Sequence, residues 1–173
     1  MKDQDDLTES IEAYVAESLR DLLDVRPESF YYITLATSGE AHPPVLSAWS
    51  REALNAVPNA DRPLLKWSYA DSPYYDFGEA YFGIVEATFE KRPSLDRLSD
   101  DARDAEVRLR LEAMVEAISR LDRKGLFGTG PERESLVVAV EVMPPDATNV
   151  SRVVRLNNGA GLKDWLAEAA EAD

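Results

Sequence analysis

The sequence of 173 residues contains no cysteine and a single histidine, His42. The absence of cysteine excludes disulfide frameworks, thiol catalysis and cysteine-ligated metals. One imidazole cannot complete a histidine-based metal site, so we expect no metal and no cofactor. His42 stands next to Pro43 and Pro44 without a recognisable nucleophile context, and this favours a loop residue over a general base.

Long apolar segments are also missing. The longest apolar runs, such as Leu136 to Val140, are far too short to cross a bilayer. The acidic N-terminus lacks the basic end, apolar stretch and cleavage site of a secretory signal, so we predict a cytoplasmic protein. The length suffices to bury a core, and we find no repeat or linker. We therefore expect one globular domain over residues 1–173 with frayed ends.

Positive charge is scarce, because 33 acidic residues outnumber 19 lysines and arginines and leave a net charge of −14. Such a charge repels nucleic-acid phosphates and anionic lipid, and it speeds encounter with a basic partner. We therefore expect no nucleic-acid or membrane partner and a basic protein as the partner class. The alternative is that the acidic surface serves solubility alone.

The hydrophobic pattern predicts an α+β fold. Helices are expected over residues 6–24, 51–57, 96–124 and 162–169, and strands over 30–37, 45–49, 64–67 and 135–143. The first two strands form a hairpin, and the apolar, β-branched run at 135–143 predicts a strand that is central or covered on both faces. Residues 147–159 fit either a helix or a strand. We predict a small, mostly antiparallel sheet of about four or five strands with helices packed against it.

The segment "YADSPYYDFGEAYF", residues 69–82, is dense in aromatic rings and carboxylates and has no positive charge. With Ser72 as N-cap and Pro73 in the first turn, a helix through residue 91 would bury Tyr81 and leave Asp76 and Glu79 exposed. Gly78 and Gly83 each cost about 1 kcal/mol in a helix. The alternative is a helix that begins only near residue 78 and leaves 69–77 as a loop.

Two groups of residues are candidates for binding. An aromatic flank beside acidic side chains suits a basic partner, with Asp71, Tyr75, Asp76, Glu79 and Phe82 as candidates. A small-molecule pocket near the edge of the sheet would be lined by His42, Trp49, Trp67 and Tyr69. The carboxylates of the first group could also form an acid/base pair or hold a divalent cation, but their spacing matches no calcium loop.

The glycine-rich stretch "KGLFGTGPE", residues 124–132, resembles a phosphate-binding loop only superficially. It lacks the Gly-Lys-Ser/Thr sequence, and it runs from a helix into a strand, which is the reverse of a P-loop. A helix that ends at Gly125 and is followed by a turn explains the glycines better.

The leading functional hypothesis is a non-catalytic acidic interaction module that binds a basic protein, in the manner of acidic bacterial immunity proteins. The alternative is a small-molecule-binding protein or enzyme with a pocket near Trp49, Trp67 and His42. A homodimer built on the aromatic flank is a third possibility.

Several segments, in their order and spacing, resemble the bacterial family grouped as domain of unknown function 4303. They are "FYYITLATSGEAHPPVLSAWSREAL", "LLKWSYADSPYYDFGEAYF", "KGLFGTG", "LVVAVEVMPPD" and "RLNN", and the similarity covers about residues 7–160. The resemblance implies a single-domain α+β protein that is bacterial and cytoplasmic. Its motifs are structural and not catalytic, so it assigns no functional residue.

Overall fold

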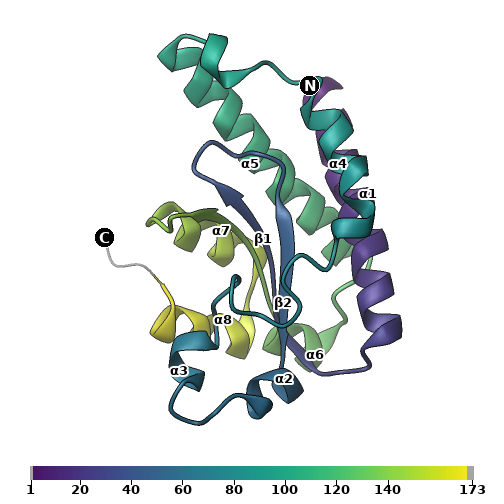
Figure 1. Ribbon diagram of the computed structural model, residues 1–173, viewed down its shortest axis with the longest axis vertical. Helices are drawn as coiled ribbons and strands as arrows, with labels where there is room; N and C mark the ends of the chain where they lie inside the picture. The colour runs from purple at the N-terminus through teal and green to yellow at the C-terminus, as the bar shows by residue number, and fades with distance from the viewer. Residues whose placement is uncertain (1, 171–173) are drawn as a thin grey trace.

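A three-stranded sheet lies at the centre of the computed structural model, which describes residues 2–170 (Figure 1). The strands are β1 (Phe30–Ser38), β2 (Val45–Ser50) and β3 (Val137–Met143), in the order β2-β1-β3. β1 pairs antiparallel with β2 and parallel with β3. The α+β class is confirmed. The expected fraying of the chain ends concerns Met1 and residues 171–173, which lie outside the described residues.

Helices surround the sheet (Figure 1). α1 (Lys2–Val25), α4 (Phe82–Phe89) and α5 (Asp100–Arg123) lie on one side, and α7 (Thr148–Leu156) and α8 (Gly159–Glu168) lie on the other. The short helices are α2 (Arg51–Ala56), α3 (Arg62–Leu65) and α6 (Gly130–Ser135), with 3-10 turns at Glu79–Tyr81 and Leu95–Arg97. Among residues 2–170, every helix is too short or too polar to serve as a membrane span.

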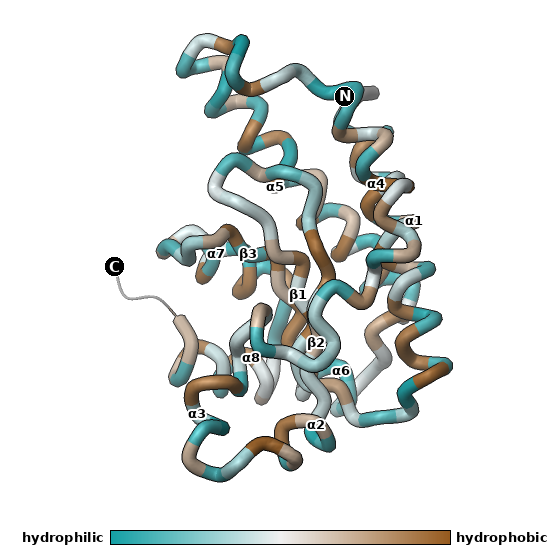
Figure 2. The backbone as a smooth tube through the Cα atoms, viewed as in Figure 1, coloured by the Kyte–Doolittle hydropathy of each residue, from teal (hydrophilic) through white to brown (hydrophobic). Residues whose placement is uncertain are grey.

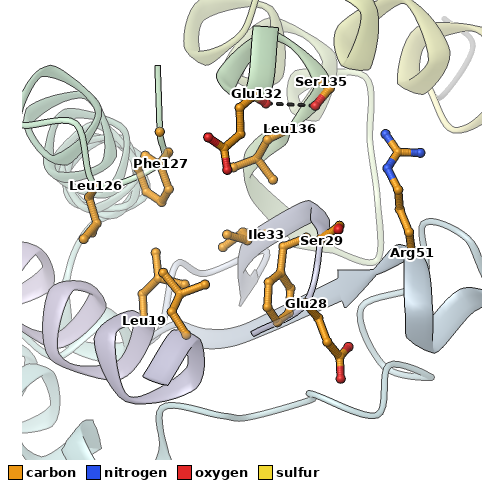
Figure 3. A pocket seen from close by; sticks show the side chains of 13 residues that line it. Leu19, Glu28, Ser29, Ile33, Arg51, Leu126, Phe127, Glu132, Ser135 and Leu136 are labelled. Carbon is orange, nitrogen blue, oxygen red and sulfur yellow. Dashed lines mark hydrogen bonds between the residues drawn. The ribbon is translucent and has the colours of Figure 1, made fainter. Parts of the chain in front are cut away.

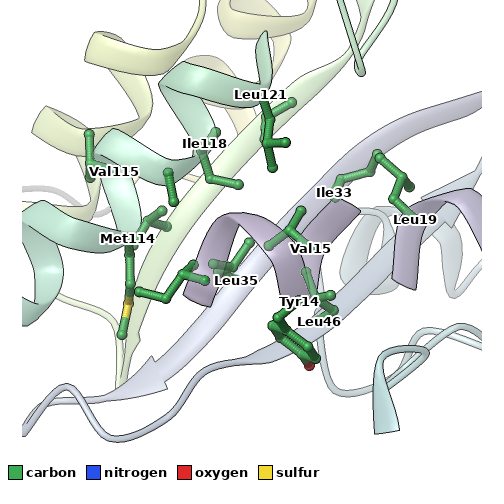
Figure 4. Packing of buried hydrophobic residues seen from close by; sticks show 14 of the residues in the cluster. Tyr14, Val15, Leu19, Ile33, Leu35, Leu46, Met114, Val115, Ile118 and Leu121 are labelled. Carbon is green, nitrogen blue, oxygen red and sulfur yellow. The ribbon is translucent and has the colours of Figure 1, made fainter. Parts of the chain in front are cut away.

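The larger core lies between the sheet and the two long helices, as predicted from their apolar stripes (Figure 4). Ile33 and Leu35 of β1 and Leu46 of β2 point toward α1 and α5. They meet Val15 of α1 and Ile118 of α5, and all five side chains are almost fully buried. Burial of each such side chain contributes about 1.5 to 3 kcal/mol, so this contact fixes the long helices on the sheet.

The second face of the sheet carries a smaller, more aromatic core. Tyr32, Trp49 and Ala139 project to this side because side chains alternate along a strand. Val153 of α7 and Trp165 of α8 cover them. Helices therefore cover both faces of β3, as its continuous apolar run predicts.

The sheet is smaller than predicted and it is mixed. Residues 64–67 were expected to form a strand, but Arg62–Leu65 is the short helix α3, with a proline in its first turn. Leu64 is 81% exposed, so this short run buries no strand face. The antiparallel expectation is wrong for β3, because a long helical connection separates it from β1 and β2, and such a crossover permits parallel pairing.

The outer edge of β3 is closed by side chains of α7 and the residue that follows it. The Asn149 amide exchanges hydrogen bonds with the backbone of Val142, at 2.8 and 3.2 Å. The Asn157 amide does the same for Val138, at 2.8 and 2.7 Å. Between them Arg152 Nε donates to the Val140 carbonyl at 2.9 Å. These side chains take the place of a fourth strand, so the edge is not open to another chain.

We predict that Asn157→Ala lowers the free energy of unfolding by about 3 kcal/mol, because it leaves buried backbone groups without partners. Asn158→Ala is the matched control. Asn158 is exposed and its side chain makes no cap hydrogen bond, so its loss should cost less than about 0.5 kcal/mol. Denaturant melts measure both. Equal costs for the two variants would show that the edge closure is not stabilising.

Candidate functional site

A groove of about 650 Å³ opens between the α2–α3 segment and the loop that contains Asp71 and Tyr74. We call it the α2–α3 groove. Trp49 of β2 lies at its base, Val57 and Leu65 line one side, and Tyr74 lines the other. Figure 2 shows apolar stretches in α2 and α3 and in the chain between them. The groove therefore brings one predicted pocket residue, Trp49, together with one predicted partner-binding residue, Asp71.

Local sequence signals build the first side of the groove. The Ser50 hydroxyl accepts a hydrogen bond from the Ala53 backbone N–H at 2.9 Å and caps α2, as the sequence predicts. α2 ends before Pro58, which cannot continue a helix hydrogen-bond ladder. Arg62 then ties α3 back to α2, because its Nε donates to the Val57 carbonyl at 2.9 Å.

The second side of the groove is held on the outer edge of β2. Trp49 Nε1 donates to the Ser68 carbonyl and Ser47 Oγ donates to the Tyr69 carbonyl, both at 2.7 Å. The Ser72 hydroxyl donates to the Ala48 carbonyl and accepts from the Tyr74 N–H at 2.9 Å. The Ser72 hydroxyl thus occupies the Ala48 carbonyl on this edge, and the Trp49 and Ser47 side chains fix the loop in place beside it.

These contacts distinguish the two predictions for residues 69–82, a helix that starts at Ser72 or a loop followed by a helix that starts near residue 78. The alternative of a loop followed by a late helix is confirmed, because turns precede the 3-10 turn at 79–81 and α4 begins only at Phe82. The helix with Ser72 as N-cap is wrong. The Ser72 hydroxyl accepts from the Tyr74 N–H as a cap would and also bonds β2, but no helix follows. Asp76 has φ 53°, a left-handed conformation that interrupts a helix.

The groove carries few charges, and they differ in their surroundings. Asp61 and Asp71 are exposed, and one oxygen of Asp71 accepts from Ser68 Oγ at 2.6 Å. The Arg26 guanidinium lies 5.9 Å from the centre of the Tyr74 ring. The Tyr74 hydroxyl donates to a Glu28 oxygen at 2.7 Å, and burial together with this carboxylate raises the pKa of Tyr74.

The most exposed apolar side chains do not line the groove. Among the described residues the three most exposed large apolar side chains are Leu64, Val25 and Tyr75, at 81%, 71% and 49%. Each is only a sequence neighbour of a lining residue. The apolar surface of the groove comes instead from its own lining, which includes Val57 and Leu65, and an apolar surface of this kind can mark an interaction site.

The other predicted partner-binding residues point elsewhere. Glu79 is exposed, but Phe82 packs edge-on against the buried Tyr14 ring, with 6.3 Å between ring centres. Asp76 was expected on the exposed side of a helix. Its Oδ1 is instead buried without a hydrogen-bond partner in the described structure, and burial together with Glu79 raises its pKa. The five candidates therefore do not share one surface.

The predicted pocket residues are also divided. Trp67 packs on Tyr31 and donates from Nε1 to Glu168 at 2.9 Å, beside a separate hollow of about 160 Å³. Tyr69 packs against Tyr75, with 6.1 Å between ring centres. The structure brings neither residue into the lining of the α2–α3 groove.

His42 lies far from the predicted tryptophans. It follows the end of β1 in the β1–β2 loop, where its Nδ1 is 2.7 Å from Ser38 Oγ. Trp49 pairs with Tyr32 near the start of β1, and a strand rise of about 3.3 Å per residue puts about 20 Å between the two sites. His42 therefore lines a different hollow, next to Arg110.

The sequence did not predict one buried polar cluster, which is centred on Glu141. Glu141 of β3 is 6% exposed, and it accepts hydrogen bonds from the Tyr32 hydroxyl and, at 2.7 Å, from Thr34 Oγ1. Burial raises the pKa of Glu141, although both hydroxyls and Arg152 act in the opposite direction. Its signal in the sequence was a lone carboxylate inside an apolar, β-branched run.

The cluster does not form a metal site, since no group of three or more His, Asp or Glu side chains within the described residues could hold a cation. It also lines none of the hollows described above. Glu141 therefore serves as an internal acceptor that satisfies two buried hydroxyls.

We predict that Glu141→Gln gains stability relative to the natural chain as the pH rises from 4 toward 7. A carboxyl has a pKa of about 4.3 in the unfolded chain, and burial raises it in the fold. In the natural chain the protonated Glu141 carboxyl therefore stabilises the fold below its unfolded pKa. This contribution is lost as the pH rises toward the folded pKa. Glutamine does not titrate, and its carbonyl can still accept from both hydroxyls. Denaturant melts across this pH range test the prediction, and a difference that does not change with pH would contradict it.

The comparisons with known proteins agree with the resemblance in the sequence. The family model described as Domain of unknown function (DUF4303) matches residues 7–158. No curated protein and no solved structure matches this chain. Because the family model covers most of the 173 residues, the chain belongs to the family of domain of unknown function 4303.

Proposed function

We propose that this protein is a non-catalytic binding module that receives an apolar and basic segment of a partner protein in the α2–α3 groove. The observation that carries the proposal is the chiefly apolar lining of the open groove, with Val57, Leu65 and Tyr74, beside the exposed carboxylates of Asp61 and Asp71. Apolar surfaces rimmed by polar groups are typical of protein interfaces. An aromatic or aliphatic side chain of the partner would enter the groove as an anchor.

The shape of the apolar surface favours a peptide chain over a small molecule. A volume of about 650 Å³ falls within the range of small-molecule sites. However, the groove is open to solvent, so a small molecule confined to it would stay largely exposed. A peptide segment can cross such an open groove and bury one side chain in it.

Charge favours a basic partner. The chain carries a net charge of −14, and the groove lining adds Asp61 and Asp71 against Arg26 alone. Such a surface steers a basic partner toward the groove and repels an acidic one. An immunity protein that neutralises a basic toxin in the bacterial cytoplasm would be one such module.

The alternative of a small-molecule site formed jointly by Trp49, Trp67 and His42 has less support. These three residues border three separate hollows. The Trp49 ring is also 1% exposed, with its N–H already bonded, so it offers a ligand little surface.

Selection of random displayed peptides on the immobilised protein tests the proposal. We expect enriched peptides that combine one or two large apolar residues with lysine or arginine. Asp61→Lys combined with Asp71→Lys should weaken a selected peptide at least about tenfold, because it turns attraction into repulsion at the groove. Isothermal titration measures the affinities, and denaturant melts confirm that the variant folds.

The matched control makes the same change of charge away from the groove. Glu86→Lys combined with Glu90→Lys reverses two exposed carboxylates in and just after α4. In 0.15 M salt, where screening acts over about 8 Å, we expect a change of less than about threefold. Enrichment of acidic peptides, no enrichment, or equal weakening by both variants would refute the proposed site.

A further inference from the structure

A second, more enclosed pocket lies on the other side of Glu28 from the α2–α3 groove, and it is independent of the proposed function. Its volume is about 300 Å³. We call it the α1–α6 pocket, because Leu19 of α1 and Leu136, which follows α6, lie on opposite sides of it (Figure 3). Ile33 lies between them, and Phe127 lies beside them. The walls combine these hydrocarbon side chains with polar groups, among them Glu28, Arg51 and Glu132.

One carboxylate of the pocket, that of Glu132, is without a partner among residues 2–170, and Glu132 is exposed to solvent. Figure 3 shows the Glu132 side chain directed from α6 toward Ile33, between Phe127 and Leu136. No hydrogen bond or ion pair of its carboxylate occurs within the described residues; the one contact drawn there joins the Glu132 backbone carbonyl to Ser135 Oγ at 2.8 Å. The carboxylate is thus available to a ligand.

The glycine-rich loop helps to place this carboxylate. Gly128 has φ +85°, and a Cβ added to it would lie 3.4 Å from the carboxylate oxygen Oε2 of Glu132. A side chain at this position would press on the carboxylate group as well as strain the backbone. A glycine here therefore gives Glu132 room beside the loop.

Two other polar residues of the pocket, Ser29 and Glu28, are already engaged, and Arg51 lies at its far side. Ser29 donates its N–H and hydroxyl to Glu52, at 2.9 and 3.1 Å. Glu28 accepts from Ser50 and, at 2.7 Å, from Tyr74. Arg51 carries its guanidinium at the far side of the pocket from Phe127, pointing away from Glu28 in Figure 3.

We propose that the α1–α6 pocket binds a small organic amine. The ammonium group pairs with the Glu132 carboxylate, and the hydrocarbon body packs against the more accessible lining residues Leu23, Phe30 and Leu126. Since a water molecule occupies about 30 Å³, a pocket of about 300 Å³ accommodates a ligand of about ten non-hydrogen atoms.

Three probes that share one hydrocarbon body test the charge requirement. They are 4-phenylbutylamine, 4-phenylbutanol and 4-phenylbutyrate, and saturation-transfer NMR with isothermal titration measures their binding to the full chain. We expect the amine to bind at least about tenfold more tightly than the alcohol, as a charge-assisted hydrogen bond implies, and the carboxylate probe not to bind. Equal binding of the amine and the alcohol would overturn the proposal. So would a failure of the amine to bind at about 10 mM, a concentration at which even a weakly binding small ligand is detected.

Two isosteric variants locate the ammonium. Glu132→Gln should weaken the amine about tenfold and leave the alcohol unchanged. Glu134→Gln removes an exposed carboxylate on the same helix that does not line the pocket, so it controls for general attraction to an acidic protein. If both variants weaken the amine equally, or if neither does, Glu132 is not the site of binding.

Discussion

Closure of the two free edges of the sheet is the constraint on which the rest of this structure depends. With three strands, β2 and β3 are both edge strands, and their outward backbone groups need partners that are not other protein chains. The residues Asn149, Arg152 and Asn157 supply those partners on β3. On β2 the Ser72 hydroxyl does so for the Ala48 carbonyl, and the side chains of Ser47 and Trp49 hold the loop at 68–72 across this edge by donating to its carbonyls. A small sheet is thereby sealed without additional strands.

The way β2 is sealed also creates the surfaces that we propose for binding. Because the loop is tied to the strand, Tyr74 stands opposite α2 and α3, and the α2–α3 groove lies between them. The Tyr74 hydroxyl then bonds Glu28, which lines the α1–α6 pocket on its other side. The Glu28 carboxylate thus holds Tyr74 on one side of the groove and forms part of the wall of the pocket. The sites differ in what they offer, since the groove is open and chiefly apolar in its lining, whereas the pocket is smaller and its lining holds one carboxylate without a partner in the described part of the chain, that of Glu132.

The elements that the sequence predicted correctly are those in which local pattern and burial agree. The helices α1 and α5, the β1–β2 hairpin and strand β3 have periodic or continuous apolar runs, and these runs face the core. The Leu64–Trp67 run failed because four residues carry no reliable period and Pro63 favours a helix start. The early helix start failed although Ser72 accepts from the Tyr74 N–H, because the left-handed backbone at Asp76 interrupts the segment.

The site was less predictable, because it depends on contacts between distant segments. Asp71, Tyr75 and Trp49 were named from composition, and the structure places them at or beside one groove. No local signal tells that Asp76 turns inward, since this follows from its left-handed backbone. The free carboxylate of Glu132 likewise becomes visible only when α6 is placed over Ile33.

Hydrogen–deuterium exchange in the presence of a selected peptide tests the central claim most directly. If a partner occupies the groove that the sealed edge creates, bound peptide should slow exchange in residues 51–65 and 69–75 and leave α4 unchanged. Protection confined to α1 and α4, with none at 51–65, would contradict the account, because it would place the partner on the acidic helical face instead of in the groove.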